Sequence, residues 1–385
     1  MEQAKPPLEC CPFAPAAAEP SPPRPPERPG RKLLRAVSAF VFVYITLAAG
    51  HLMMVAINAI DLRVSAATYR RPGVEARWFG DEPLATALQY AHKGAPRRAG
   101  ASAASSPTPR RSGAHLAMLP VSTFLIAATL GLILAGLGLL LWSRGVRSDA
   151  AQTVLGVFAG LSIWTGVEYS LMLASRVLGI AKAVRYHGGA AIGTYGEYVL
   201  LKHTWGILAM VGMYLLFLES NRCPFFVWCR RQVPLMRGAV CTGRIDNYAP
   251  RTAFEYIAIV WTFYLVLLWA YDPEVFGVEG LLTHALFFGS FALTGYLMLR
   301  LYRQSAIGPA VRYAIGVAII AWIPIEIAAK WRLFREPWLI LSPMTAVAFF
   351  GGAALGTWLV VWEIRRNRRE AAEGQAIGAE PAERR

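Results

Sequence analysis

Two hexapeptides of this chain place a tryptophan four residues before a glutamate inside long apolar runs. WTGVEY contains Trp164 and Glu168, and WIPIEI contains Trp322 and Glu326. An ionisable side chain that faces lipid near the centre of a membrane costs about 2.5–3.5 kcal/mol even on a lenient insertion scale. The two carboxylates should therefore face other helices or water, where they can hold a cation or a proton.

Three histidines, His51, His203 and His284, lie in other apolar runs of the same chain. Imidazoles from different helices, completed by a carboxylate, are suitable ligands for a transition metal or a haem. A hydrogen bond within the bundle is the more common role of a single membrane histidine, and no Glu-x-x-His motif of the di-iron kind occurs. The three histidines are therefore candidates for binding a substrate or ion together with Glu168 and Glu326, and alternative candidates for binding a metal. No catalytic residue or cofactor is assigned.

The elements that carry these residues are predicted to be transmembrane helices. Hydrophobic residues make up 55% of the chain and charged residues 16%, which is too apolar for a soluble protein of this length. A helix needs about 20 apolar residues to cross the hydrocarbon core. Windows close to or above this length are 35–60, 116–142, 150–175, 203–218, 252–271, 280–299, 313–329 and 338–362. The predicted fold is an all-α polytopic membrane protein with about eight transmembrane helices.

Lysines and arginines beside the predicted spans indicate the orientation, because they gather on the cytoplasmic side. With an even number of spans, most of the basic clusters in tails and short connectors fall on one side. Both termini are therefore predicted to be cytoplasmic, and the membrane to be the cytoplasmic (inner) one if the source is bacterial. Arg176, Lys182, Arg185 and Lys202 run against this orientation. The net charge of +15 fits the topology and attraction to anionic lipid, and no basic module for nucleic acid is visible.

The chain divides into five regions around the predicted spans, two of which are halves of four helices each. The regions are a disordered Pro-rich cytoplasmic tail at 1–33, a first half at 34–219 with a long outer loop at 61–114, a basic cytoplasmic connector at 220–251, a second half at 252–363 and a charged cytoplasmic tail at 364–385.

The two glutamate motifs lie at corresponding places in these halves. Each falls in the third span of its half, and the fourth spans end in the similar sequences LLFLESNR and LVVWEIRRNRR. We interpret this as a 4+4 direct repeat whose halves are related by an axis along the membrane normal. In this arrangement both glutamates and all three histidines fall in the outer half of the membrane. Glu326 also lies four residues before Lys330, the spacing of an ion pair on one helix.

Three functions are open on this pattern. Related carboxylates in two halves that rock against each other suit a transporter of a small cationic or protonatable solute, which is the preferred hypothesis. The histidines suit a membrane-embedded metal- or haem-dependent enzyme instead. The glutamates could also lock helices together in a structural or anchoring subunit of a membrane complex. The expected partners are the lipid bilayer, a small solute or ion, and a membrane protein or second copy of the chain. No nucleophile elbow, Walker loop or dinucleotide fingerprint occurs.

Overall fold

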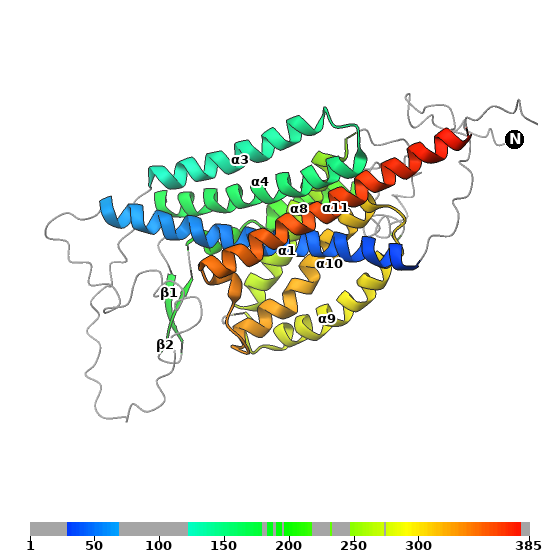
Figure 1. The fold of residues 1–385 in the computed structure, drawn as a ribbon. Helices are drawn as coiled ribbons and strands as arrows, with labels where there is room; N and C mark the ends of the chain where they lie inside the picture. The colour runs from blue at the N-terminus through cyan, green and yellow to red at the C-terminus, as the bar shows by residue number, and fades with distance from the viewer. Residues whose placement is uncertain are drawn as a thin grey trace, which may run out of the picture.

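The protein is a bundle of long helices (Figure 1). The computed structural model describes residues 29–68, 122–178, 183–187, 190–194, 196–217, 232, 247–272 and 275–378. Its elements are α1 (Pro29–Thr68), α3 (Thr123–Ser143), α4 (Asp149–Val177), β1 (Ala183–His187), β2 (Ala190–Thr194), α5 (Gly196–Lys202), α6 (Trp205–Phe217), α8 (Tyr248–Ala270), α9 (Leu281–Tyr302), α10 (Ile307–Lys330), the 3-10 turn η2 (Pro337–Leu339) and α11 (Pro343–Gly378). Most of the predicted disordered tail, outer loop and basic connector lie outside the described residues.

Seven of the described helices are long and apolar enough to cross a membrane, which confirms the prediction of a polytopic helical membrane protein. These helices are α1, α3, α4, α8, α9, α10 and α11. The predicted span at 203–218 corresponds to α6, which has 13 residues. At 1.5 Å per residue α6 is about 20 Å long, shorter than the hydrocarbon core. An eighth span of sufficient length is therefore not found among the described residues.

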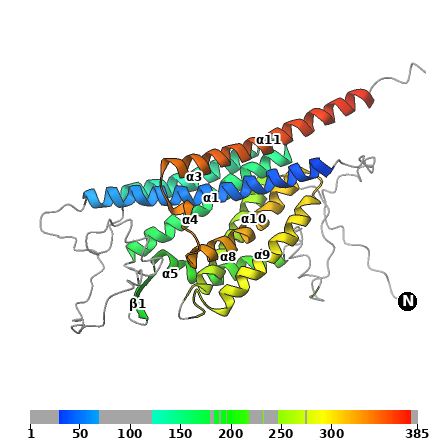
Figure 2. The same ribbon diagram turned by 60° about the horizontal axis from the view of Figure 1, so that its bottom comes forward.

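Polar contacts between helices hold one end of the bundle, here called the Asp61 end. Asp61 on α1 accepts a hydrogen bond from Ser122, the N-cap of α3, and lies 2.7 Å from Nη2 of Arg176 near the end of α4. Lys202, the last residue of α5, pairs with Asp272 just after α8. These contacts bring the ends of α1, α4 and α8 to the same side of the bundle, as Figure 2 also shows.

The opposite end, here called the Arg35 end, is held in the same way. Nε of Arg35 on α1 lies 3.5 Å from Oε1 of Glu363 on α11, and Nη1 of Arg35 donates to the carbonyl of Gln304 at 2.8 Å. The backbone N–H of Tyr248, at the start of α8, donates to the side chain of Gln152 on α4 at 2.8 Å. The start of α1 and the part of α11 around Glu363 therefore lie at the same end of the bundle.

The chain changes ends between α5 and α8. Lys202 lies at the Asp61 end through its pair with Asp272, and Tyr248 lies at the Arg35 end through its bond to Gln152. The segment 203–247 must therefore connect the two ends, and α6 is its first part.

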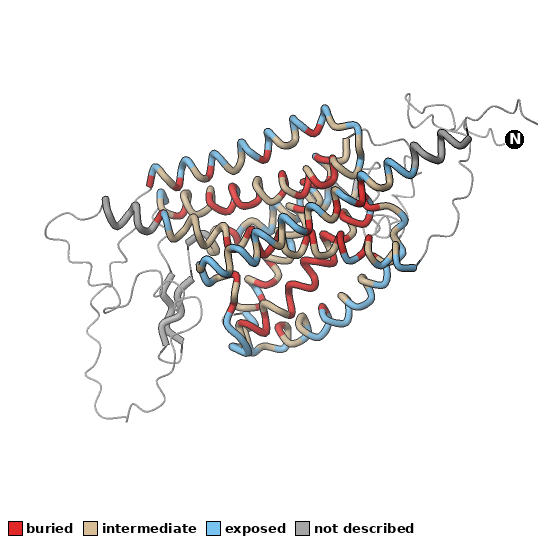
Figure 3. Tube along the Cα trace, in the orientation of Figure 1, coloured by how far each residue is buried: buried red, intermediate tan, exposed pale blue. Residues whose placement is uncertain are grey.

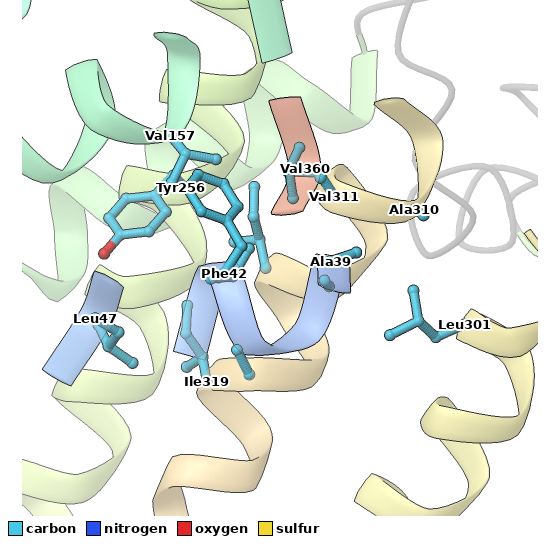
Figure 4. Close-up of a cluster of buried hydrophobic side chains, with 14 of the residues drawn as sticks. Ala39, Phe42, Leu47, Val157, Tyr256, Leu301, Ala310, Val311, Ile319 and Val360 are labelled. Carbon is cyan, nitrogen blue, oxygen red and sulfur yellow. The ribbon is translucent and has the colours of Figure 1, made fainter. Parts of the chain in front are cut away.

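Helix α10 is the centre of the bundle. Of its most apolar stretch of 18 residues 72% are buried, against 11% of the corresponding stretch in each of α9 and α11. Figure 3 shows the buried residues concentrated on the inner helices and the exposed ones on α3, α9 and α11. Side chains of α10 pack with Phe42 of α1, Val157 of α4 and Tyr256 of α8 in one cluster (Figure 4). The outer helices α3, α9 and α11 thus present apolar surface that suits lipid.

Glycines let two pairs of helices approach closely. A Cβ atom on Gly156 or Gly160 of α4 would lie 2.6 Å or 3.0 Å from a backbone oxygen of α8. A Cβ atom on Gly356 of α11 would lie 2.9 Å from the Cα of Phe42 on α1, and Gly352 one turn earlier faces the same helix. Both seams use two glycines four residues apart, the spacing that permits close contact of membrane helices.

Helix α10 ends in a turn that brings the chain back over its own last residues. Arg332 has φ of 62°, in the left-handed region, and its N–H donates to the carbonyl of Ala329 at 2.9 Å. The N–H of Leu333 donates to the carbonyl of Ala328 at 3.1 Å. This is the Schellman pattern, which satisfies the last carbonyls of a helix and is usually formed by glycine. The turn leads to Glu336.

An antiparallel hairpin, which the sequence does not predict, links α4 to α5. Strand β1 pairs with β2 in a register that places Arg185 opposite Ile192. The all-α prediction therefore describes the membrane-crossing part and omits this hairpin.

Replacing Gly160 by leucine should separate α4 from α8. The added side chain has no room against the α8 backbone, and overpacking of this kind costs about 1–3 kcal/mol or more. Gly138→Leu on α3, where a Cβ would meet nothing within 4 Å, is the matched control. Thermal unfolding in detergent should show a lower midpoint for Gly160→Leu alone; equal midpoints would contradict the close seam.

Replacing Arg332 by glycine should leave a more stable protein than replacing it by alanine. Both changes remove the same side-chain contacts, but alanine keeps the cost of the left-handed conformation, about 1 kcal/mol. The comparison of the two unfolding midpoints isolates the backbone effect. A higher midpoint for the alanine variant would show that the turn does not have this conformation.

Candidate functional site

Glu168 lies on α4 and faces α8. Its side chain is buried, and its Oε1 accepts a hydrogen bond of 3.2 Å from the hydroxyl of Tyr264. Gly156, Gly160, Trp164 and Glu168 follow one another at intervals of four residues, so they share the helix face that packs on α8. Gly156 and Gly160 allow α4 to pack closely on α8, and further along the same face of α4 Glu168 lies beside Tyr264.

Glu326 lies on α10 and is half-buried. The indole Nε1 of Trp322, one turn earlier, donates to its Oε2 at 3.2 Å. The expected pair with Lys330 is replaced by another: Nζ of Lys330 lies 3.9 Å from Oε1 of Glu336. The turn after α10 carries Glu336 back to this lysine, which explains why spacing along one helix did not identify the partner.

Tyr264 of α8 bonds the first of the two acids. Its ring hydroxyl donates to Glu168 and shares a hydrogen bond with Tyr198 of α5. Glu326 is carried by α10, which packs on both α4 and α8. Trp164 packs edge-on against the ring of Tyr264 at a centroid distance of 6.3 Å. Helices α4, α5, α8 and α10 therefore contribute to one polar cluster, which we call the Tyr264 cluster: Glu168, Tyr198, Tyr264 and Glu326.

His51 joins this cluster through Trp322. Its ring stacks on the indole of Trp322 at 5.2 Å with an interplanar angle of 27°, and its Nδ1 lies 3.3 Å from the carbonyl of Leu47. Trp338 packs on the other side of the contact, 4.5 Å from Trp322, and donates from Nε1 to Glu336 at 3.2 Å. His51, Trp322 and Glu326 thus form one continuous contact from α1 to α10.

The other two histidines lie elsewhere. His203 is exposed in the turn between α5 and α6, with Nδ1 2.7 Å from the carbonyl of Val199. His284 on α9 lies against Trp331 at 4.8 Å, with Nδ1 3.1 Å from the carbonyl of Gly280. Within the described ranges, no three His, Cys, Asp or Glu side chains gather as a metal site requires. The structure therefore links His51 to Glu326 through Trp322 and places His203 and His284 at other contacts.

The two motif tryptophans pack on two different helices, Trp164 on α8 and Trp322 on α1. Trp164 of α4 lies 6.2 Å from Trp261 and 6.3 Å from Tyr264, both on α8. Trp322 of α10 lies 5.5 Å from Tyr44 and 5.2 Å from His51, both on α1. Each motif tryptophan therefore lies against two rings of another helix.

Sequence reasoning missed three polar residues of this region. Tyr264 gave no signal, because tyrosine is common in membrane helices. Glu336 stands in a connector, where acidic residues are ordinary. Asp61, 1% exposed, could have been found, because it closes the apolar run of α1 in the sequence INAIDLR.

Comparisons with protein-family models, curated proteins and solved structures found no significant match to this chain. The site is therefore interpreted from its own geometry.

Replacing Asp61 by asparagine should destabilise the protein strongly. The change leaves Arg176 without its buried counter-charge, a loss that costs about 3–5 kcal/mol when one partner of a buried pair is removed. Glu255→Gln is the matched control, because its pair with Arg251 is about a quarter exposed and is worth about 0.3–0.5 kcal/mol. Thermal unfolding in detergent checks both; equal losses would contradict the structural role of Asp61.

Proposed function

We propose that this protein is a transporter of a small cationic or protonatable solute, with Glu168 and Glu326 as the binding acids and His51 beside them. The observation that carries the proposal is the Tyr264 cluster, in which the buried acid of α4 bonds a tyrosine of α8 and a second acid stands on α10, the helix that packs on both. Buried carboxylates of this kind are costly in a membrane and usually mark ion or proton pathways.

The arrangement of the helices supports the 4+4 direct repeat that this mechanism uses. Helix α4, third in the first half, packs on α8, the first of the second half. Helix α10, third in the second half, packs on α1, the first of the first half, and α4 and α10 also contact each other. An axis along the membrane normal between α4 and α10 would produce this reciprocal pattern. The acids then lie at the interface of the halves.

The topology supports eight crossings and an outward-facing site. The proposal includes an additional crossing between Lys202 and Tyr248, which lie at opposite ends of the bundle, with α6 as its first part. The Asp61 end is then the outer side and the Arg35 end the cytoplasmic side, in the inner membrane if the organism is bacterial. Glu168 lies nine residues before Val177, about 14 Å of helix from the outer end of α4. Glu326 lies nearer to the outer side, four residues before the end of α10, and His51 lies at a depth similar to that of Glu168, ten residues before Asp61. Both are half-buried.

Glu168→Gln and Glu326→Gln should each abolish transport while the protein still folds, because glutamine has the same shape and can still accept the hydrogen bonds from Tyr264 and Trp322. The measurement is charge movement in proteoliposomes on a solid-supported membrane, after concentration jumps of protons, sodium or choline. Wild-type protein should respond to at least one of these jumps.

Glu255→Gln, at the Arg35 end of α8 and outside the Tyr264 cluster, is the matched control and should respond like the wild type. A wild-type protein that responds to none of the three jumps, or glutamine variants that respond normally, would refute the proposal. Loss of folding in both glutamine variants would favour the structural-subunit hypothesis instead.

A further inference from the structure

Four buried hydroxyl groups of the bundle have no hydrogen-bond partner among the described residues, those of Thr46, Thr165, Tyr256 and Tyr271. Three of them belong to residues that are themselves almost fully buried: Thr46 of α1, Thr165 of α4 and Tyr256 of α8. These residues are 2%, 0% and 1% exposed. A hydroxyl in a membrane interior has no bulk water to satisfy it, so three unpaired groups on three adjoining helices require a reason.

The two threonines differ from the other threonines of the membrane helices. A helical threonine commonly donates its hydroxyl to the carbonyl four residues earlier. Six threonines of this protein do so at 2.7–2.8 Å: Thr129, Thr153, Thr252, Thr262, Thr294 and Thr357. Thr46 and Thr165 instead leave their hydroxyls without this bond. Their side chains therefore present the oxygen to another partner.

Thr46 lies on the face of α1 that packs on α4. Phe42, one turn earlier, contacts Phe158 of α4 at a ring distance of 5.7 Å. Gly50, one turn later, faces Leu161 of α4, whose methyl would lie 2.7 Å from an added Cβ. Residues 42, 46 and 50 share one helix face, so Thr46 lies in the seam between α1 and α4.

Thr165 lies in the same seam on the α4 side. Leu161, one turn earlier, contacts Gly50 of α1, and Tyr169, one turn later, donates its hydroxyl to the carbonyl of Met54 on α1 at 2.8 Å. Thr165 is also three residues before Glu168, and residues at this spacing are neighbours on a helix. Thr165 therefore lies within one helical turn of the acid of the Tyr264 cluster.

Tyr256 completes the set from α8. It lies eight residues before Tyr264, on the same face of the helix, and its Cβ packs 3.0 Å from the position of a Cβ on Gly160 of α4. In Figure 4 its hydroxyl oxygen points toward the segment of α1 that carries Leu47. The three hydroxyls thus lie around the junction of α1, α4 and α8, on the Arg35 side of Glu168.

We propose that Thr46, Thr165 and Tyr256 bind internal waters that continue from Glu168 toward the Arg35 end, and that the species moved along this path is the proton. The inference rests on the transport function proposed above and names its substrate. Buried waters usually make about three hydrogen bonds to otherwise unsatisfied polar groups, and hydroxyls can both donate and accept.

The number and type of these groups favour a proton over a dehydrated metal cation. A hard cation takes about six or more oxygen ligands, usually including carboxylates. Here each helix offers a single neutral hydroxyl. In a transfer step, Glu168 receives a proton from the Asp61 side and passes it to a water beside Thr165. One O–H bond breaks and one forms in each transfer, and no other reactant is needed.

The test is proton uptake by liposomes that contain the full-length protein and a trapped pH-sensitive dye, driven by a potassium diffusion potential. Thr165→Val and Tyr256→Phe keep the shape of the side chain and remove the hydroxyl, and each should slow the initial rate about tenfold or more, as loss of a positioned proton-transfer group does. Thr46→Val should act in the same direction. Thr129→Val, which removes a hydroxyl already bonded to its own helix, is the matched control and should conduct like the wild type.

The outcomes separate this inference from the proposed function. Normal proton uptake by the three hydroxyl variants, with uptake lost in Glu168→Gln, would overturn the hydroxyl path and leave the transporter intact. Charge movement with sodium or choline but no proton uptake would overturn the proton as substrate. Uptake that persists in Glu168→Gln and Glu326→Gln would overturn the transport function itself.

Thermal stability gives a second and independent readout. If the hydroxyls bind water, Thr165→Val and Tyr256→Phe should leave the unfolding midpoint unchanged or lower it. If the hydroxyls are dry, removing an unpaired buried polar group should raise the midpoint, which would refute the inference. Should Thr165→Val fail to fold, Thr165→Ser retains the hydroxyl and should restore proton uptake.

Discussion

The architecture depends on one constraint: a charged side chain inside a membrane is costly unless it pairs within the protein. At the Asp61 end this pairs Asp61 with Arg176, and at the Arg35 end it pairs Arg35 with Glu363. Both pairs join helices that are distant in the sequence, so they select which helices are neighbours rather than only strengthening a contact. Replacing such pairs by apolar residues can preserve stability, but the apolar surfaces alone would accept many more arrangements of the helices.

Close packing then determines the depth at which each side chain lies. Gly160 allows α8 to approach α4, and one face of α4 carries Trp164 and Glu168 along the same line. A wider separation would move Tyr264 out of hydrogen-bond reach of Glu168, because their present distance is 3.2 Å. The hydrogen bond between Glu168 and Tyr264 therefore depends on Gly160, about two turns away. The same reasoning applies to α10, whose burial at the centre brings Trp322 against both His51 and Trp338.

The sequence predicted what is local and periodic. Hydrophobic length located seven helices that can cross a membrane, and the cost of a buried carboxylate correctly directed Glu168 toward other helices. It did not predict pairings across helices, because spacing along one helix says nothing about a neighbour. The spacing of Glu326 and Lys330 suits an ion pair on one helix, yet the lysine lies 3.9 Å from Glu336 in the following turn. His203 and His284 were grouped with His51 on depth alone, yet each lies at a different contact.

The two tryptophan–glutamate motifs have different neighbours, and this difference bears on how the proposed site could work. Beside Trp164 and Glu168, helix α8 supplies the hydroxyl of Tyr264, whereas beside Trp322 and Glu326, helix α1 supplies the imidazole of His51. Two identical acids in identical surroundings would hold a charge equally well and give it no preferred position. A hydroxyl on one side and an imidazole on the other make the two positions unequal, because the hydroxyl of Tyr264 donates a hydrogen bond to its acid, whereas the imidazole of His51 stacks on Trp322. In the transport function proposed above, this inequality would hold a proton at one acid and release it at the other.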